Sequence, residues 1–342
     1  MLDDLKLIHE KDAQDALGIA EKQWQQLEYN FEIDGDLPIG EISNIVVAGM
    51  GGSALAALLL TSLPGINLPF QICRDYDLPA YVGPNTLIVA SSYSGNTEET
   101  VSCLNQAIEK KAKIVVMAGG GKLIDIAKEN KLAYITLPPA GQPRFAALYG
   151  LNALVTLFSE LNLIPAETLK EIKDSAKFVK QSTAQWGPMV AKSNNIAKQY
   201  AYEVIGNTPV IYAGPFLYPS AYKWKISFNE NAKNVAWCNQ YPEFNHNEFL
   251  GWSSHPLDKP YRVFDLRSNL DNPQITKRFE ISDKLLSGRR PSAIVVNAQG
   301  ETQLQQLLWT VALGDFISIY TAILNGLNPT PVDLIEKLKK QL

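Results

Sequence analysis

The chain has 342 residues, of which 46% are hydrophobic and 19% charged, and a formal net charge of -4 at pH 7. This composition excludes a disordered chain, and the length suffices for two domains of ordinary size. The negative balance argues against nucleic acid as the main partner, because binding nucleic acid usually requires a basic face.

Cysteine usage and apolar runs suggest where the protein works. Cys73, Cys103 and Cys238 are scattered without metal-type spacing, which suits a reduced, cytoplasmic setting. The amino terminus is charged at residues 3, 4 and 6, unlike a signal sequence. The longest apolar runs look interrupted well short of a membrane span, so we expect no membrane partner.

The first half of the chain predicts a helical lead-in over 1–40 and a first domain over 41–163. In this domain, short apolar runs alternate with segments of helical spacing. The predicted strands lie near 45–48, 70–74, 87–90, 113–117 and 133–137. The predicted helices lie at 53–60, 96–110, 123–129 and 144–161. Such alternation is typical of a doubly wound α/β fold with a parallel sheet.

The second half predicts a helical connection over 164–206 and a second α/β domain over 207–342. The helices of the connection are expected at 166–183 and 189–204. In the second domain, strands are predicted at 210–213, 235–237, 261–266 and 293–297. Helices are predicted at 218–228, 303–324 and 331–342. The two domains share their alternation of elements but no obvious sequence identity.

Two polar loops follow strands of the first domain and precede helices. The first is Gly-Met-Gly-Gly-Ser at 49–53, and the second contains Ser92, Ser94 and Thr97. A helix start has unpaired backbone N–H groups and a positive dipole end, so it attracts an anion. Hydroxyl groups add donors without charge. Two such loops at neighbouring strand ends predict a site for the phosphate of a small polar molecule.

Other interpretations of these loops remain. Residues 49–54 also fit G-x-G-x-x-A, the dinucleotide fingerprint, with Asp75 and Asp77 roughly where a nicotinamide site needs an acid. The glycine loop could also be only a tight strand-to-helix turn. The second loop could be a serine-rich N-cap, which accounts for one hydroxyl but not three. Gly-Gly-Gly-Lys at 119–122 lacks the P-loop pattern and indicates a flexible turn.

Candidate catalytic groups come from elsewhere in the chain. Glu230 is flanked by two asparagines, which could hold a proton-transfer base in one orientation, or it is an ordinary polar helix end. His246 could move a proton near neutral pH, or be an exposed histidine after an N-cap at Asn245. Arg144 could stabilise a developing oxyanion, or be a solvated first-turn charge. His255 is another of the three histidines of the chain. One of the lysines at 337, 339 and 340 could reach an active site, but their spacing does not indicate which one.

These residues together resemble the bifunctional phosphoglucose/phosphomannose isomerase family, which has two sugar isomerase (SIS) domains. The shared motifs follow in family order. They are residues 49–53, Ser-Tyr-Ser-Gly-Asn-Thr-Glu-Glu-Thr at 92–100, Pro-Arg at 143–144, Phe-Asn-Glu-Asn-Ala-Lys at 228–233, Asn-His-Asn at 245–247 and Ile-Glu-Lys-Leu-Lys at 335–339. The Glu230 and His246 motifs, sixteen residues apart, are the most specific.

The resemblance implies a role for each motif. Glu230 would be the base that moves a proton between C1 and C2, and Arg144 would stabilise the cis-enediolate. His246, helped by Lys339, would open the sugar ring, and Thr330 would let the site accept both C2 epimers. The phosphate would lie on Gly51, Gly52, Ser53, Ser92, Ser94 and Thr97. It further implies a homodimer in which His246 reaches the partner's site, with no metal and no cofactor.

The sequence therefore predicts an isomerase that interconverts glucose 6-phosphate and mannose 6-phosphate with fructose 6-phosphate through a cis-enediol. One rival is a non-catalytic SIS module that senses sugar phosphates, which would not need Glu230, His246 and Arg144 together. The other is a nicotinamide dehydrogenase that uses the glycine loop, and cofactor fluorescence on mixing would detect it.

Overall fold

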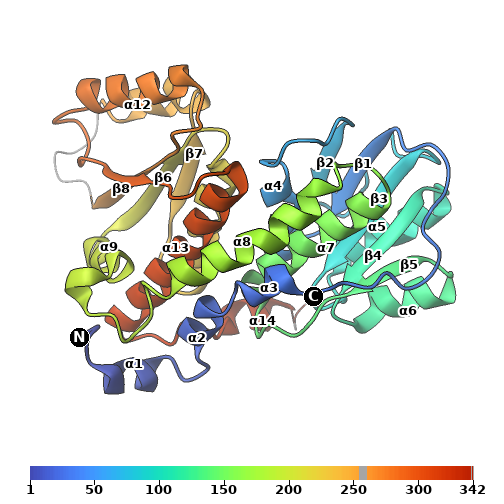
Figure 1. The fold of residues 1–342 in the computed structure, drawn as a ribbon, viewed down its shortest axis with the longest axis horizontal. Helices are drawn as coiled ribbons and strands as arrows, with labels where there is room; N and C mark the ends of the chain where they lie inside the picture. The colour runs from blue at the N-terminus through green and yellow to red at the C-terminus, as the bar shows by residue number, and fades with distance from the viewer. Residues whose placement is uncertain (254–259, 340, 342) are drawn as a thin grey trace. The chain divides into compact units, whose positions relative to one another are not determined.

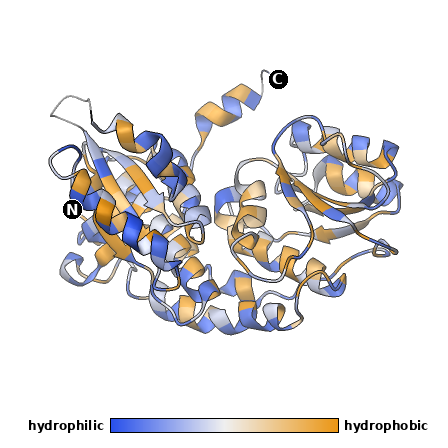
Figure 2. Ribbon diagram, turned by 90° about the horizontal axis from the view of Figure 1, so that it is seen from above, coloured by the Kyte–Doolittle hydropathy of each residue, from blue (hydrophilic) through white to orange (hydrophobic). Residues whose placement is uncertain are grey.

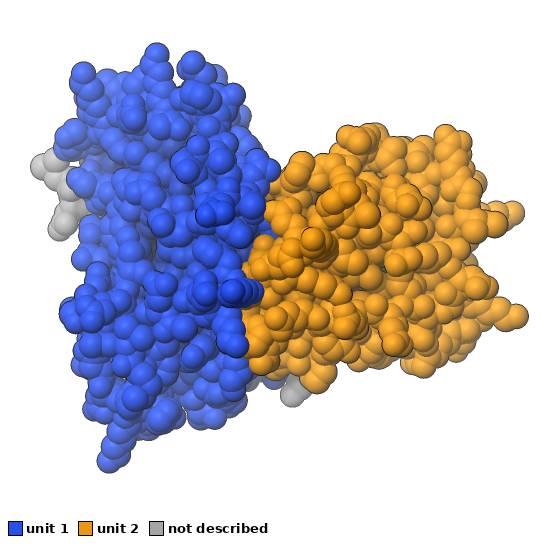
Figure 3. Space-filling view, viewed as in Figure 1, with its two compact units in different colours: residues 1–22, 177–342 blue, residues 23–176 orange. Residues whose placement is uncertain are grey.

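The computed structural model describes residues 1–253, 260–339 and 341. The chain forms two compact units, which Figure 3 colours separately. Unit 1 consists of Met1–Lys22 and Lys177–Leu342, and unit 2 of Gln23–Ala176. These boundaries differ from the predicted ones. Residues 1–22 belong to the unit with the second sheet, and the predicted connection at 164–206 is divided between the units.

Unit 2 contains a parallel five-stranded sheet in the order β2-β1-β3-β4-β5 (Figure 1). The strands are β1 (Asn44–Ala48), β2 (Phe70–Cys73), β3 (Thr86–Ser92), β4 (Lys113–Ala118) and β5 (Ala133–Thr136). All five predicted strands of this domain are confirmed. Every residue of β3 is buried, as expected for a central strand covered on both faces. Figure 2 shows how hydrophobic these strands are.

The helices of unit 2 follow the strands as predicted. They are α4 (Gly51–Leu60), α5 (Glu98–Glu109), α6 (Gly121–Glu129) and α7 (Ala147–Glu160), with α3 (Gln25–Glu28) and the 3₁₀ turn η1 (Pro143–Ala146). Apolar residues of α5 and α6 pack with those of β1, β3 and β4 in one core. Helices α4 and α7 pack together so closely that a Cβ on Gly150 would lie 2.8 Å from that of Ala56.

Unit 1 contains a second parallel sheet, in the order β7-β6-β8-β9. Its strands are β6 (Thr208–Ala213), β7 (Trp237–Gln240), β8 (Tyr261–Arg267) and β9 (Ile294–Asn297), and its main helices are α9 (Ile196–Val204), α10 (Tyr218–Glu230), α12 (Pro273–Leu285) and α13 (Gln303–Leu324). The α/β class and the parallel sheets flanked by helices are thus confirmed.

Two elements of unit 1 differ from the prediction. The strand predicted at 235–237 begins instead at Trp237 and runs to Gln240. It is an edge strand whose residues are only partly buried, so its apolar pattern is weak. Helix α12 was not predicted. Its sequence is mostly polar, with Ile275 and Phe279 buried, although Asn272 caps it and Pro273 is its first residue.

Helix α13 corrects the statement that the apolar runs fall well short of a membrane span. Its 22 residues are long and apolar enough to cross a membrane by length and composition. However, 94% of its most apolar window is buried inside the structure. The helix packs against α9 and α10, and Trp224 Nε1 donates to the carbonyl of Thr310 at 2.7 Å. This burial is typical of a core helix.

The remaining helices include α8 (Glu167–Thr183), which confirms the helix predicted at 166–183, and several short ones. The short ones are α1 (Leu5–Lys11), α2 (Ala16–Glu21), η2 (Lys192–Asn194), η3 (Glu243–His246), α11 (Glu248–Gly251) and α14 (Asp333–Lys339). The predicted helical lead-in is therefore three short helices. The helix predicted at 189–204 is shorter, because it begins at Ile196 with Asn195 as its N-cap.

Candidate active site

The two polar loops of unit 2 lie side by side. Strands β1 and β3 are parallel neighbours with Ala48 opposite Ala90, so both loops begin at the carboxyl ends of adjacent strands, on the same side of the sheet. The backbone N–H of Tyr93 donates to Ser53 Oγ at 2.9 Å, and Ser91 Oγ donates to the carbonyl of Ser53 at 3.4 Å. The residues predicted to bind phosphate are therefore brought together from both loops.

The three hydroxyls of the second loop form one cluster. Ser92 Oγ lies 2.8 Å from Thr97 Oγ1 and 3.5 Å from Ser94 Oγ. Ser92 is buried and also accepts a hydrogen bond from the N–H of Gly95 at 3.2 Å, whereas Ser94 is exposed and Thr97 half-buried. Ser92 thus organises the loop, and the hydroxyls of Ser94 and Thr97 are the more accessible ones.

The glycine triplet at 119–121 supports this serine loop. A Cβ on Gly95 would lie 1.7 Å from the carbonyl oxygen of Gly120, so the two segments touch through their backbones. The N–H of Gly119 donates to the carbonyl of Tyr93 at 3.0 Å. The N–H of Lys122 donates to Asn96 Oδ1 at 3.1 Å. The triplet therefore has a packing role that the interpretation as a flexible turn did not foresee.

Arg144 lies beside the first loop. A Cβ on Gly52 would be 2.8 Å from the carbonyl carbon of Pro143 and 2.9 Å from the nitrogen of Arg144. Arg144 is 1% exposed, and its guanidinium lies 4.6 Å from the centre of the Phe145 ring. This burial contradicts the interpretation as a solvated charge, because a buried cation needs anionic or polar partners.

In unit 1, Glu230 is the last residue of α10 and is half-buried. The next residue, Asn231, is fully buried and donates to Ser318 Oγ on α13 at 2.9 Å. Lys233 Nζ donates to the carbonyls of Asn328 at 2.7 Å and Pro329 at 3.1 Å. These bonds hold the segment after Glu230 against the segment that leads into Thr330.

The other predicted groups of unit 1 lie on separate segments. Thr330 is buried, and its N–H donates to Asn328 Oδ1 at 3.0 Å. His246 is exposed at the end of η3, and Lys339 is exposed in the last turn of α14. Asn247, and not Asn245 as considered above, accepts from the N–H of Glu248. His255 and Lys340 lie outside the described residues.

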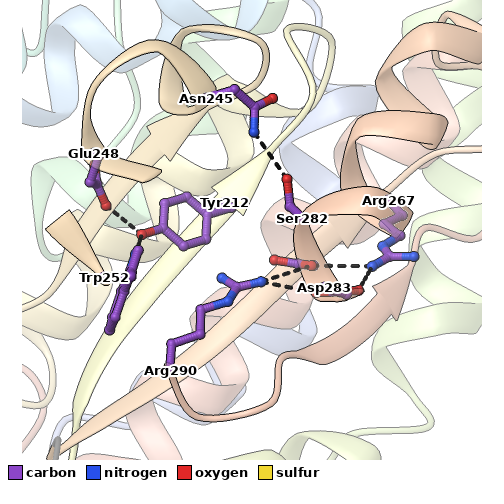
Figure 4. A network of polar contacts seen from close by, with 9 residues as sticks. Tyr212, Asn245, Glu248, Trp252, Arg267, Ser282, Asp283 and Arg290 are labelled. Carbon is purple, nitrogen blue, oxygen red and sulfur yellow. Dashed lines mark hydrogen bonds and ion pairs between the residues drawn. The ribbon is translucent and has the colours of Figure 1, made fainter. Parts of the chain in front are cut away.

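A charged network in which Asp265 and Arg290 are buried lies beside β8 (Figure 4). Arg267 donates to Asp265 at 3.2 Å and to Asp283 at 2.5 Å, and Arg290 donates to Asp283 at 2.9 Å. Desolvation raises the pKa of Asp265 to about 6, an effect that the nearby Arg290 partly offsets. The neighbour of Asp283 in the chain, Ser282, accepts from Asn245 Nδ2 at 3.0 Å. The network therefore adjoins the segment that carries His246.

Comparison with known proteins decides the family. Residues 193–342 match the family model "Bacterial phospho-glucose isomerase C-terminal SIS domain". The chain is 34% identical over 328 residues to a bifunctional phosphoglucose/phosphomannose isomerase of Caldicellulosiruptor bescii, covering 93% of this chain and 96% of that protein. This chain belongs to the bifunctional phosphoglucose/phosphomannose isomerase family.

Two further proteins are similar to this member of the phosphoglucose/phosphomannose isomerase family. It is 30% identical over 238 residues to a D-glucosamine-6-phosphate 4-epimerase of Sulfolobus acidocaldarius, covering 68% of this chain and 72% of that one. Its fold is similar to that of a glucose-6-phosphate isomerase like protein from Thermus thermophilus, with a TM-score of 0.66 and 17% identity, over 99% of this chain and 98% of the other.

Sequence reasoning missed two features of this family member. Tyr93 connects three loops, since its hydroxyl also accepts from the N–H of Ala140 at 2.5 Å. Glu248 is held by hydrogen bonds from Tyr212 and Asn239. Tyr93 could have been singled out because it lies inside the serine motif. Residues 212 and 239 are too far from residue 248 in the sequence for a local pattern to connect them.

The acidic side chains bear on the metal and dinucleotide questions. Within the ranges 1–253 and 260–339, no group of three or more His, Cys, Asp or Glu side chains is arranged to hold a metal ion. Asp75 Oδ1 accepts from the N–H of Tyr76, and Asp77 Oδ1 accepts from Gln106 Nε2 at 3.1 Å. Both acids considered for a nicotinamide site therefore accept hydrogen bonds from other residues of unit 2. The absence of a metal and of a cofactor stays a prediction.

Proposed function

We propose that this protein interconverts glucose 6-phosphate and mannose 6-phosphate with fructose 6-phosphate. The observation that carries the proposal is the 34% identity, over nearly the whole chain, to a bifunctional phosphoglucose/phosphomannose isomerase. The joined loops of unit 2 support it, because two helix starts and a hydroxyl cluster offer donors suited to a phosphate monoester. The substrates are thus hexose 6-phosphates.

Phosphate binding in unit 2 would serve the reaction at the other end of the sugar. Gly51, Gly52, Ser53, Ser92, Ser94 and Thr97 would hold the phosphate. A fixed phosphate limits the positions of C1 and C2, so binding energy far from the reacting carbons lowers the barrier. Arg144, buried beside Gly52, would stabilise the negative oxygen of the enediolate.

Glu230 would be the base. It removes a proton from C2 of the open-chain aldose, which leaves a cis-enediolate over C1 and C2. The proton is then delivered to C1, the hydroxyl proton of O2 passes to O1, and O2 becomes the carbonyl oxygen of the ketose. His246, helped by Lys339, would open the ring before this step. Thr330 would allow the proton to be placed on either face of C2. Lys233, which connects residues 231 and 328–329, supports a common location for Glu230 and Thr330.

The assembly and location are also part of the proposal. We infer a homodimer in which His246 serves the partner's site, and its exposed side chain is compatible with such a role. We infer a cytoplasmic location, since the three cysteines are free thiols.

The test is incubation of the protein with fructose 6-phosphate and a chelator, followed by assays for both aldose phosphates. The proposal predicts both products. Glucose 6-phosphate alone would leave an isomerase but contradict the double specificity. Neither product would favour a sugar-phosphate sensor, for which equilibrium binding of fructose 6-phosphate is the readout. Glucosamine 6-phosphate serves as a control substrate, because one relative is named a D-glucosamine-6-phosphate 4-epimerase.

A further inference from the structure

His246 lies between two residues whose side chains are held by the core of unit 1. On one side, Asn245 Nδ2 donates to Ser282 Oγ at 3.0 Å, and Arg278 donates to Asn245 Oδ1 at 3.1 Å. Both partners belong to α12. These bonds fix the residue immediately before the histidine, so the peptide between 245 and 246 has a defined orientation.

Glu248 provides the second point of attachment (Figure 4). Its Oε1 accepts from the hydroxyl of Tyr212 on β6, and its Oε2 accepts from Asn239 Nδ2 on β7 at 2.7 Å. Trp252 Nε1 in turn donates to the Tyr212 hydroxyl at 3.1 Å. The carboxylate two residues after His246 is thus attached to two adjacent strands of the sheet.

Tyr212 makes this attachment rigid. Its side chain is fully buried, and its ring centre lies 4.4 Å from that of Phe244 in the 3₁₀ turn that ends at His246. Desolvation, followed by the negative charge of Glu248, raises the pKa of Tyr212, so the hydroxyl stays protonated and acts as a donor. A hydrogen bond from a buried donor to a carboxylate is among the stronger ones in proteins.

The imidazole of His246 has no such support of its own. It is exposed and makes no side-chain hydrogen bond among the residues that the structure describes. Its location is therefore set by the backbone between residues 245 and 248. Opening a pyranose breaks the C1–O5 bond, delivers a proton to O5 and releases the proton of the C1 hydroxyl. A proton donor for O5 must lie within hydrogen-bond reach.

We propose that Glu248, held by Tyr212 and Asn239, is a positioning residue for His246 in ring opening. This inference rests on the proposed function. Without the Tyr212 bond, the backbone at 246–248 samples more conformations, and the imidazole spends less time at the ring oxygen. Glu248 touches no reacting atom in this account. Its removal lowers the rate of ring opening and leaves the binding of an open-chain ligand unchanged.

Ring opening can be measured separately from isomerisation. Opening and reclosing the ring interconverts the α and β anomers of glucose 6-phosphate, and NMR exchange spectroscopy reports that rate. We expect Tyr212→Phe and Glu248→Ala to lower the enzyme-catalysed anomerisation rate about tenfold, the usual scale for losing one hydrogen bond to a charged group. Glu248→Gln, which keeps an acceptor for Tyr212, retains most of the rate.

Two controls separate positioning from damage to the fold. Tyr200→Phe removes the hydroxyl of a half-buried tyrosine on α9 whose ring packs against Phe264 and which takes no part in the bonds of Glu248 or Asn245. It should anomerise like the wild type. The inhibition constant of 5-phosphoarabinonate, an open-chain analogue of the enediolate, should be unchanged in Tyr212→Phe. A variant with a disordered site would bind this inhibitor more weakly.

Each outcome decides the inference. Equal anomerisation by Tyr212→Phe, Glu248→Ala and Tyr200→Phe would overturn the positioning role and leave the isomerase function intact. Weaker inhibitor binding in proportion to the lost rate would also overturn it, in favour of a general structural role. If the wild type accelerates neither anomerisation nor isomerisation, the proposed function itself fails, and the positioning role fails with it.

Discussion

The backbone N–H of Tyr93 donates to Ser53 Oγ at 2.9 Å, and this bond connects the two loops that follow β1 and β3. Because Ser53 is already an acceptor for Tyr93, its hydroxyl hydrogen remains available to a phosphate. Ser53 would therefore both join the loops and bind the substrate, which makes it the most sensitive hydroxyl of the proposed phosphate site.

We expect Ser53→Ala to raise the KM for fructose 6-phosphate about tenfold or more, with a smaller effect on kcat. The reason is that both a phosphate donor and the bond between the loops are lost. The matched control is Ser43→Ala, which removes an exposed hydroxyl just before β1, at the opposite end of the strand. Equal KM values for the two variants would remove Ser53 from the phosphate site.

A second prediction concerns the backbone contact between the glycine loop and Arg144. Gly52→Ala places a Cβ 2.8 Å from the carbonyl carbon of Pro143, so the backbone of one segment has to move. We expect a loss of about 1–3 kcal/mol in stability together with a lower kcat, since Arg144 moves with Pro143. Thermal unfolding and steady-state kinetics measure both.

Gly83→Ala is the control for that substitution. A Cβ at Gly83 meets no atom within 4 Å, so this variant should unfold and turn over like the wild type. If Gly52→Ala also unfolds and turns over like the wild type, the position of Arg144 does not depend on the backbone of the glycine loop.

The sequence predicted the alternating strands of unit 2 well, because each is a short, continuous apolar run. Residues 87–90 lie at the centre of the sheet and are fully buried. The signal failed for β7, because an edge strand keeps polar residues such as Asn239. It also failed for α12, although Asn272 and Pro273 mark the start of that helix in the way that helix N-termini usually do.

Long-range contacts explain the remaining differences. Lys198 is buried, and its Nζ donates to Asp3 at 3.0 Å, a contact that connects the amino terminus to α9, and α1 and α2 belong to unit 1. A local pattern cannot reveal a pair 195 residues apart. The same holds for the Tyr212–Glu248 bond. The polar residues of each loop could be singled out because each loop motif is contiguous, whereas the supporting contacts come from distant elements.

The third prediction tests the buried ion pair between α10 and α13. Lys223, which is fully buried, donates to Asp315 on α13, and Ser227 Oγ donates to the same carboxylate at 2.8 Å. Lys223→Met leaves a buried carboxylate without its cation and should cost about 3–5 kcal/mol in the free energy of unfolding, measured with urea.

Two further variants complete that test. The double variant Lys223→Met/Asp315→Leu should recover most of the lost stability, because no uncompensated charge remains. Lys225→Met, two residues along α10 and only half-buried, should change little. A double variant as unstable as the single one would show that the pair itself stabilises the helix contact.

The fourth prediction concerns pH and Asp265. Its folded pKa of about 6 lies above the value of about 3.9 in an unfolded chain, because burial penalises the charged carboxylate. Between pH 4 and 6 the folded state holds more protons than the unfolded one, so this group's contribution to stability falls as the pH rises.

Comparison with Asp265→Asn isolates this effect. The difference in unfolding free energy, wild type minus variant, should fall by about 2 kcal/mol between pH 4 and pH 7. Asp125→Asn, which changes an exposed acid in unit 2, should run parallel to the wild type. If the unfolding free energies of Asp265→Asn and the wild type also run parallel with pH, the pKa of Asp265 is not raised in the folded state.

The most direct measurement of the central claim is the conversion of fructose 6-phosphate in D₂O, with a chelator present and the products analysed by NMR. A cis-enediol mechanism with Glu230 as the base predicts glucose 6-phosphate and mannose 6-phosphate, with deuterium at C2 in the turnovers in which the proton on Glu230 exchanges with solvent before its return. Glu230→Gln should form either product at least about 100-fold more slowly while still anomerising glucose 6-phosphate. An active Glu230→Gln variant would contradict the mechanism, and no product from the wild type would contradict the function.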